Sequence, residues 1–263
     1  MIAPRVALVT GGGTGIGAAA AERLAADGYR VVVTGRRAGP LSEVAERIGA
    51  LPLPGDMTDS ASVAGVVDAV LAEYGRLDVV VANAGGHGFS SVTDTDDESW
   101  RASLDANLTT AFMVCRRALP ELARSAGAIV VVSSLAGLRA GPSVAGYTVG
   151  KHALIGLARS MARDFGPSGV RVNSVCPGWV RTPMADAEMD ELAQVAGIAG
   201  REEAYALVTE NVPLRRASEP AEIAGVVAFL ASADSSYITG ATIVADGGAH
   251  IVDVPTLAFD ALG

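Results

Sequence analysis

Short runs of β-branched residues alternate with longer amphipathic stretches along all 263 residues of the chain. This alternation is typical of a parallel sheet that is covered by helices on both faces. The runs predict about seven strands, near Val6–Val9, Arg30–Thr34, Ala50–Leu53, Leu77–Val81, Ala128–Ser133, Arg171–Val175 and Thr242–Val244. The stretches between them predict helices that begin near Ile16, Pro40, Ser60, Trp100, Tyr147 and Pro220. The expected fold class is therefore α/β, with a doubly wound parallel sheet.

No linker, repeat or low-complexity tract divides the chain, so we expect a single domain over residues 1–263. Two regions interrupt the alternation. Residues 181–211 are rich in alanine, glutamate and methionine and carry no strand signal, which is typical of a substrate lid or a disordered excursion. The tail at residues 249–263 is apolar but follows the last expected strand, so it either frays or docks on another surface.

Composition excludes several classes of protein. The net charge of −9 and the lack of a basic run argue against a nucleic-acid or anionic-membrane partner. No apolar run approaches the roughly 18 residues of a membrane span, and no signal peptide precedes the first strand. Cys115 and Cys176 form no disulfide framework, which indicates a reduced, cytoplasmic location. His87, His152 and His250 do not cluster, so we expect no metal.

A glycine-rich segment, Thr10–Gly17, joins the first expected strand to an alanine-rich helix. Glycines at Gly11, Gly15 and Gly17 let the backbone approach a phosphate closely, and a helix amino terminus attracts negative charge. The strand, turn and helix context therefore predicts a nucleotide site.

The second expected strand ends in Gly35-Arg36-Arg37, without the acidic residue that would bind an unphosphorylated ribose. An arginine can hold a 2′-phosphate through two hydrogen bonds, which favours NADP(H) and leaves NAD(H) possible. Alternatively, Arg36 only lines the surface and the choice of cofactor is loose.

The segment Tyr147–Lys151 has an unusual composition. The chain holds 20 lysine and arginine residues, and only Lys151 is a lysine. Residues four apart on a helix share a face, so Tyr147 and Lys151 can point into one cleft. A compact ammonium beside a phenol lowers the phenol pKa from its ordinary value of about 10. The same spacing also fits a solvated surface pair.

Five motifs occur in order: Thr10–Gly17, Asn83-Ala84-Gly85, Ser134, Tyr147-x-x-x-Lys151 and Pro177-Gly178. With them the chain resembles the short-chain dehydrogenase/reductase family, from about Val6 to Gly248, and is similar to its 3-oxoacyl-[acyl-carrier-protein] reductase-like members. The resemblance implies a single NAD(P)-binding Rossmann domain. It also implies an oxidoreductase that interconverts a ketone and a secondary alcohol by hydride transfer.

The resemblance implies a role for each residue of the catalytic set. Tyr147 would be the general acid/base, and Lys151 would hold the nicotinamide ribose and lower the pKa of Tyr147. Ser134 would hydrogen-bond the substrate oxygen; Ser133 competes for this role, but the thirteen-residue spacing to Tyr147 selects Ser134. Asn107 would support a water relay to the lysine, or it is an ordinary polar residue on a helix.

The resemblance also implies the cofactor contacts. They are Thr10, Gly11, Gly13, Thr14, Gly15, Ile16, Gly17, Arg36, Arg37, Asp56, Met57, Asn83, Ala84, Gly85, Tyr147, Lys151, Pro177, Gly178, Val180 and Thr182. Among these, Asp56 would contact the adenine, and Pro177, Gly178 and Thr182 would border the nicotinamide carboxamide.

Other activities stay open. A cofactor-sensing module without catalysis would keep the nucleotide site, although the intact catalytic set favours an enzyme. An NAD-preferring alcohol dehydrogenase of the same fold is a second alternative. Epimerases and dehydratases usually have a larger carboxy-terminal domain, which argues against them. Enoyl reductases typically space tyrosine and lysine further apart, so the four-residue spacing argues against them too.

The substrate and the assembly are less constrained. The apolar content of residues 181–211 and of the tail hints at a hydrophobic carbonyl or alcohol, such as a β-ketoacyl chain, steroid, terpenoid or quinone. His87 either faces this substrate or lies on a loop surface. Family members commonly pair the helices near Trp100–Leu119 and Tyr147–Phe165 between subunits. We therefore expect a homotetramer in which the tail packs across subunits.

Overall fold

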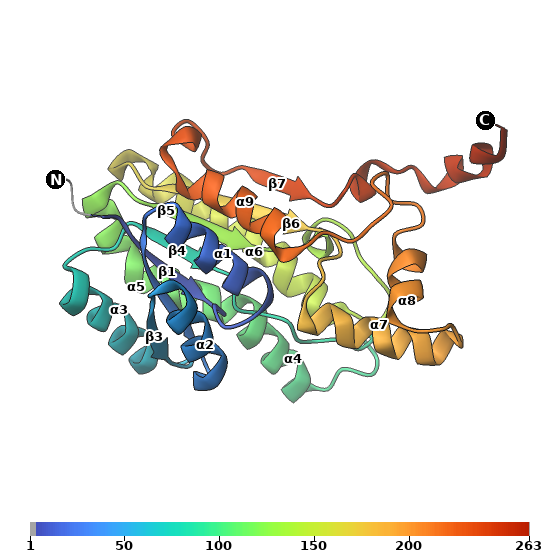
Figure 1. The fold of residues 1–263 in the computed structure, drawn as a ribbon, viewed down its shortest axis with the longest axis horizontal. Helices are drawn as coiled ribbons and strands as arrows, with labels where there is room; N and C mark the ends of the chain where they lie inside the picture. The colour runs from blue at the N-terminus through green and yellow to red at the C-terminus, as the bar shows by residue number, and fades with distance from the viewer. Residues whose placement is uncertain (1–3, 263) are drawn as a thin grey trace.

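The computed structural model describes residues 4–262, which form a seven-stranded, all-parallel sheet (Figure 1). The strand order is β3-β2-β1-β4-β5-β6-β7. The strands are β1 (Val6–Thr10), β2 (Arg30–Gly35), β3 (Leu51–Pro54), β4 (Val79–Ala82), β5 (Ala128–Val132), β6 (Arg171–Pro177) and β7 (Thr242–Ala245). Every strand lies within about two residues of its predicted position, which confirms the predicted fold class.

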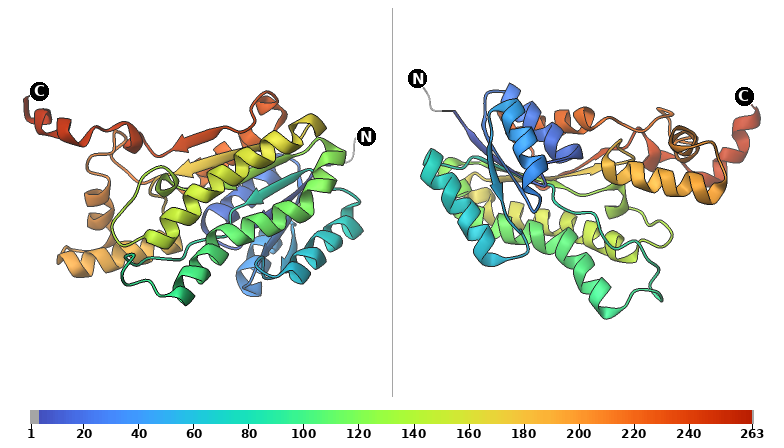
Figure 2. Two further views of the ribbon diagram at one scale, coloured as in Figure 1. Left: turned by 180° about the vertical axis from the view of Figure 1, so that it is seen from behind. Right: turned by 60° about the horizontal axis from the view of Figure 1, so that its bottom comes forward.

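Helices cover both faces of the sheet (Figures 1 and 2). One face packs against α1 (Gly15–Ala26), α2 (Ala38–Ile48) and α9 (Pro220–Ala231). The other packs against α3 (Ser60–Tyr74), α5 (Thr110–Ser125) and α6 (Ala145–Phe165). The central strands β1, β4 and β5 are buried along their whole length, which explains their uninterrupted valine-rich sequences.

The expected helix near Trp100–Leu119 is three segments rather than one. Helix α4 (Asp97–Leu104) begins where the Asp96 carboxylate accepts a hydrogen bond from the Ser99 amide at 2.7 Å. A π-helical turn, Asp105–Thr109, then separates α4 from α5. Such turns insert an extra residue into a helix and are frequent at functional sites.

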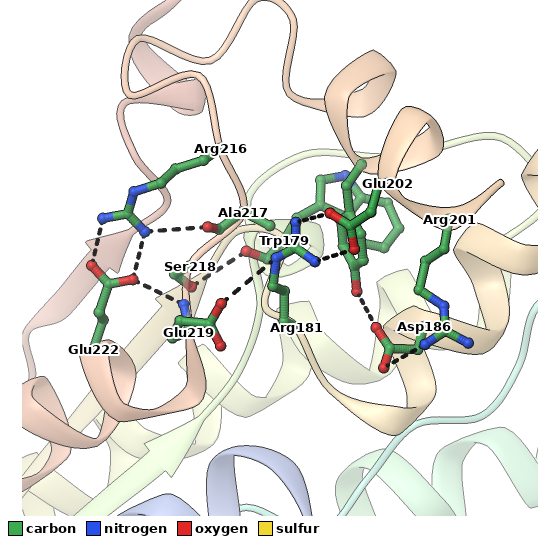
Figure 3. A network of polar contacts seen from close by, with 11 residues as sticks. Trp179, Arg181, Asp186, Arg201, Glu202, Arg216, Ala217, Ser218, Glu219 and Glu222 are labelled. Atoms are coloured by element: carbon green, nitrogen blue, oxygen red, sulfur yellow. Dashed lines mark hydrogen bonds and ion pairs between the residues drawn. The ribbon is translucent and has the colours of Figure 1, made fainter. Parts of the chain in front are cut away.

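Residues 181–211 are ordered, so the disordered alternative is wrong. They form α7 (Pro183–Ala196) and α8 (Arg201–Val208), which bury a small core of their own, made of Ala185, Met189, Ala193, Ala204, Tyr205 and Ala217. Arg181 anchors this region between two acids (Figure 3). Its guanidinium donates to Glu202 at 2.7 and 2.8 Å and lies 3.6 Å from Glu219.

The tail leaves the body of the fold after β7, as all three views show (Figures 1 and 2). It forms two short 3₁₀ segments, Ala249–Ile251 and Val254–Leu262, and exposes Ile251, Val254 and Phe259. Gly263 lies outside the described residues. Within residues 4–262, no helix combines the length and the apolar character that a membrane crossing requires.

A buried carboxylate joins the first residues of three strands. Asp78 accepts hydrogen bonds from the Val6 amide at 2.8 Å and from the Arg76 guanidinium at 2.6 and 2.8 Å. Its own backbone pairs with Val6 and with Ala128, at the start of β1 and β5. The Asp78 side chain is only 2% exposed, so no water can replace these contacts.

We predict that Asp78→Ala lowers the free energy of unfolding by about 2–4 kcal/mol, because it leaves the buried Val6 amide without an acceptor. Denaturant unfolding measures this loss. Arg101→Ala is the control: it removes an exposed pair with Asp97 and should change stability by less than about 0.5 kcal/mol. Equal effects of the two substitutions would contradict the role of Asp78.

Candidate active site

The chain order reverses between β1 and β4, and the glycine segment lies at this point of the sheet. In parallel sheets, ligands bind at the carboxyl ends of strands where the order reverses. The Asn83 side-chain amide donates to the carbonyl oxygens of Thr10 and Gly11 at 3.0 and 3.3 Å. The Thr10 hydroxyl in turn accepts from the amides of Asn83 and Ala84 at 3.0 and 3.1 Å. The two loops are therefore held together as one structure.

The glycine segment has the geometry of a phosphate cradle. Gly11 and Gly15 have φ angles of 63° and 54°, which β-carbon-bearing residues rarely adopt. A β-carbon on Gly17 would clash with the Gly11 carbonyl oxygen. Thr14 precedes α1 without a side-chain cap, so its hydroxyl does not satisfy the first amides of the helix. The residues present therefore fit a pyrophosphate at the amino terminus of α1.

Two arginines follow β2 at the rim of this cradle. Arg36 and Arg37 are exposed, and Arg36 lies close enough to Asp56 for its charge to act on that carboxyl. Hydrogen bonds from the Thr58 amide and hydroxyl, with a smaller contribution from Arg36, hold the pKa of Asp56 below its usual value. The rim therefore offers both cationic and anionic groups to a nucleotide.

Several of the predicted cofactor contacts have buried side chains, among them Met57 and Val180. Met57 packs in the core beneath α3, and Val180 packs among the residues of α9. Thr182 caps α7, and its methyl carbon lies 3.1 Å from the position that a β-carbon on Gly15 would take. The segment after Pro177 thus closes over the glycine segment.

The catalytic residues predicted from spacing lie together. Tyr147 and Lys151 occupy one face of α6, with the Lys151 ammonium nitrogen 5.6 Å from the centroid of the tyrosine ring. Ser134 follows β5, and its hydroxyl accepts from the Ala136 amide at 3.1 Å and acts to lower the pKa of the Tyr147 phenol. The adjacent Ser133 faces inward and donates to the Lys151 carbonyl oxygen at 2.8 Å. Its hydroxyl is thereby occupied, in agreement with the choice of Ser134 over Ser133.

Asn107 lies fully buried in the π-helical turn. Its amide oxygen accepts from the Gly86 amide at 2.9 Å, and its nitrogen donates to the carbonyl oxygens of His87 and Ser103 at 2.8 and 2.9 Å. A β-carbon on Gly85 would lie 3.2 Å from this oxygen and 3.3 Å from the Lys151 nitrogen. Asn107 therefore fixes the loop that follows β4 against Lys151.

We expected Lys151 to lower the pKa of Tyr147. The protein's own groups instead raise this pKa, so the expectation is wrong. Burial raises the pKa of the Tyr147 phenol, the Ser134 hydroxyl opposes this, and the charge of Glu188 adds to the rise. The Lys151 ammonium lies over the ring face and donates to the Val132 carbonyl oxygen at 3.0 Å. Burial lowers the pKa of Lys151 to about 8.

The remaining candidates lie outside this catalytic set. His87 and His152 are exposed, whereas His250 hydrogen-bonds Asp246 at 2.9 Å. Within residues 4–262 no group of three metal-ligating side chains converges. Burial raises the pKa of the Cys176 thiol.

Sequence reasoning missed three side chains near Tyr147. The Phe89 ring lies 5.3 Å from the tyrosine ring, between centroids. The Met184 sulfur lies 2.6 Å from the position that a β-carbon on Gly86 would take. Glu188, also on α7, acts on the phenol through its charge. Met184 and Glu188 lie four residues apart after the Thr182 cap. This spacing, which places both on one helix face, is the sequence signal that could have identified them.

Comparison with known proteins extends the assignment. A family model described as Enoyl-(Acyl carrier protein) reductase matches residues 11–250. Protein MoaE of Klebsiella aerogenes is 47% identical, covering 97% of this chain and 99% of its own length. Meso-2,3-butanediol dehydrogenase of Serratia marcescens is 36% identical over 95% of this chain and 96% of its own. The 3-oxoacyl-[acyl-carrier-protein] reductase MabA of Mycobacterium tuberculosis is 38% identical over 93% and 92%.

Solved structures agree with these relatives. A variant of actinorhodin polyketide ketoreductase, solved with NADPH, matches with a TM-score of 0.88 and 32% identity. The match covers 93% of this chain and 97% of that one. Three of these proteins are named as a dehydrogenase or a reductase. The family model leaves out only the first 10 and the last 13 residues of this chain. The chain belongs to the short-chain dehydrogenase/reductase family and is an NAD(P)-dependent oxidoreductase.

Proposed function

We propose that the protein is an NADP(H)-dependent enzyme that interconverts a ketone and a secondary alcohol, with Tyr147 as the general acid/base. The observation that carries this proposal is the convergence of Ser134, Tyr147 and Lys151 beside the glycine segment. Ketoreductase and alcohol dehydrogenase relatives support the reaction class. The NADPH of the ketoreductase structure supports the choice of cofactor.

This chain's residues can hold each part of the cofactor. The glycine segment and the amino terminus of α1 suit the pyrophosphate. Arg36 and Arg37 suit a ribose 2′-phosphate, Asp56 suits the adenine, and the segment from Pro177 to Thr182 suits the nicotinamide half. When bound, the cofactor would supply the hydride donor or acceptor and, in its oxidised form, a positive charge.

In carbonyl reduction, the substrate carbon gains a hydride while its oxygen takes the phenolic proton of Tyr147, so that C=O becomes CH–OH. The Ser134 hydroxyl donates a hydrogen bond to the oxygen as negative charge develops there. Lys151 holds the ribose hydroxyls, and Asn107 keeps the adjoining loop in place. The raised pKa of Tyr147 keeps the phenol protonated, which suits its role as the acid.

The assembly and the compartment belong to the same proposal. Large apolar side chains are exposed on the outer surface of α4, α5 and α6, at Trp100, Phe112 and Val149. Such a surface supports pairing of these helices between subunits of a homotetramer. Cys115 and Cys176 are buried free thiols, which supports the reducing cytoplasm.

A panel of ketones and secondary alcohols, assayed with NADPH and with NADH, tests the proposal by following cofactor absorbance. Oxidation of NADPH by at least one ketone is the expected result. Tight NADPH binding without turnover of any compound would favour the cofactor-sensing alternative. A preference for NADH would favour the NAD-preferring alternative.

We predict that Lys151→Arg lowers kcat at least about a hundredfold while the protein stays folded. Arginine keeps the charge, but its planar, wider head cannot occupy the site between Val132 and the tyrosine ring. Steady-state kinetics and thermal unfolding measure the two effects. Near-normal kcat would show that positive charge alone suffices.

We predict that kcat/KM for carbonyl reduction falls as the pH rises through about 8, where Lys151 loses its charge. Unfolding does not explain this fall. A lysine pKa that is depressed from 10.5 to about 8 destabilises the fold fully below pH 8, and this penalty decreases steadily as the pH rises from about 8 to 10.5. A pH profile of kcat/KM, with melting temperatures measured in parallel, tests the prediction. Constant kcat/KM up to about pH 9.5 would contradict it.

We predict that Arg36→Asp shifts the ratio of kcat/KM for NADPH and NADH toward NADH by about tenfold or more, since aspartate repels a 2′-phosphate. Kinetics with both cofactors at one substrate concentration measure the ratio. Arg124→Asp, at the exposed end of α5, makes the same change of charge elsewhere and should leave the ratio unaltered. Equal ratios for wild type and Arg36→Asp would place cofactor selection on other residues.

A further inference from the structure

Helix α7 turns one of its faces toward the catalytic residues. At its start, the Thr182 methyl carbon lies against Gly15, and two residues further the Met184 sulfur lies against Gly86. These contacts place the first turn of α7 over both the cofactor cradle and the loop after β4. Side chains that share this face with Met184 therefore border the space in front of Tyr147.

Glu188 lies four residues after Met184 and shares that face. The neighbouring side chains of α7 point elsewhere. Ala185 and Met189 pack into the core between α7 and α8, and Asp186 accepts a hydrogen bond from the Tyr205 hydroxyl at 2.8 Å. Figure 3 shows Asp186 directed toward Arg201 in this packed layer. The Glu188 carboxylate is thus left on the catalytic side of the helix, and its charge raises the pKa of Tyr147.

The Glu188 carboxylate has no partner within residues 4–262, whereas Asp186 and Asp190 on the same helix are paired. Arg201 bridges Asp186 and Asp190 at 3.2 and 2.5 Å. Arg181 is paired with Glu202 and Glu219 (Figure 3). Glu188 is half-buried, and this burial is the main reason that its pKa is raised. A half-buried carboxylate without a counter-charge is unfavourable, and a bound cation would relieve this cost.

The walls beside Glu188 are apolar. Phe89 stacks obliquely on the Tyr147 ring, with 5.3 Å between centroids, and both Phe89 and Met184 expose their side chains. A ligand here meets proton-donating groups at Tyr147 and Ser134, aliphatic or aromatic surface next to them, and an unpaired negative charge on α7. Each of these features selects a different part of one substrate.

We propose that the substrate is an amino ketone, or the corresponding amino alcohol, whose protonated amine pairs with Glu188 while its carbonyl oxygen contacts Tyr147 and Ser134. This inference rests on the proposed ketone reduction. It assigns specificity to a residue of the α7 face rather than to the catalytic set. The apolar carbon atoms between the amine and the carbonyl contact Phe89 and Met184.

Four ketones of similar length test the inference, because they differ only in the group at the far end. They are 4-amino-2-butanone (cation), 4-hydroxy-2-butanone (neutral donor), 2-pentanone (apolar) and 3-oxobutanoate (anion). We expect kcat/KM at pH 7 to be about tenfold or more higher for the amine than for 2-pentanone, and lowest for the anion. A hydroxyl compound that equals or exceeds the amine would overturn the cation assignment.

Substitutions on α7 locate the effect. Glu188→Gln keeps the shape of the side chain but removes the charge, so the ratio of kcat/KM for the amine and 2-pentanone should fall to within about threefold. Glu188→Lys should reverse the order in favour of the anion. Glu191→Gln is the matched control, since Glu191 is exposed on the same helix, and it should keep the wild-type ratio. Thermal melts confirm that each variant is folded.

The outcomes separate this inference from the proposed reaction. A wild-type enzyme that reduces other ketones but shows no preference among these four would overturn the role of Glu188 and leave the reaction class intact. An amine preference that survives Glu188→Gln would also overturn it. An enzyme that reduces no ketone of any kind would instead refute the proposed function.

Discussion

The burial of one ammonium group sets the geometry of the site. Lys151 is 4% exposed, and this desolvation is reflected in its lowered pKa. The position is tolerable only because the ammonium donates to the Val132 carbonyl oxygen and the backbone of its own helix is tied to Ser133. These two bonds join α6 to the end of β5. Since Ser134 directly follows this end of β5, the same contacts that hold the lysine bring Ser134 and Tyr147 to the same part of the fold.

A second constraint holds the opposite side of the cleft. The π-helical turn places Asn107 where its amide bonds three backbone groups, which fixes the loop after β4. Asn83, at the start of that loop, holds the glycine segment in the same way. The cofactor cradle and the catalytic set are thus coupled through backbone hydrogen bonds. Glycine is required at Gly17, where neighbouring atoms leave no room for a β-carbon, and a β-carbon on Gly85 would fit only if its neighbours shifted slightly.

The sequence was sufficient to predict the sheet and the shared helix face of Tyr147 and Lys151, since both are encoded locally. Valine-rich runs mark buried strands, and Tyr147 and Lys151 need only helical spacing to share a face. The pKa of Tyr147 could not be predicted, because it depends on how Phe89 and α7 pack around the phenol. The ordered helices in residues 181–211 could not be predicted from the sequence either. It rests on contacts between distant residues, such as Arg201 with Asp186 and Asp190, that no periodicity reveals.

The electrostatics of the cleft connect substrate recognition to proton transfer. The charge of Glu188 raises the pKa of Tyr147, so it strengthens the hold of the phenol on its proton. A cation that pairs with Glu188 cancels this influence and lowers the pKa again. Binding of an ammonium-bearing substrate would therefore make the phenol a better proton donor at the moment when a carbonyl is in place. The same carboxylate would then select the substrate and adjust the acid that acts on it.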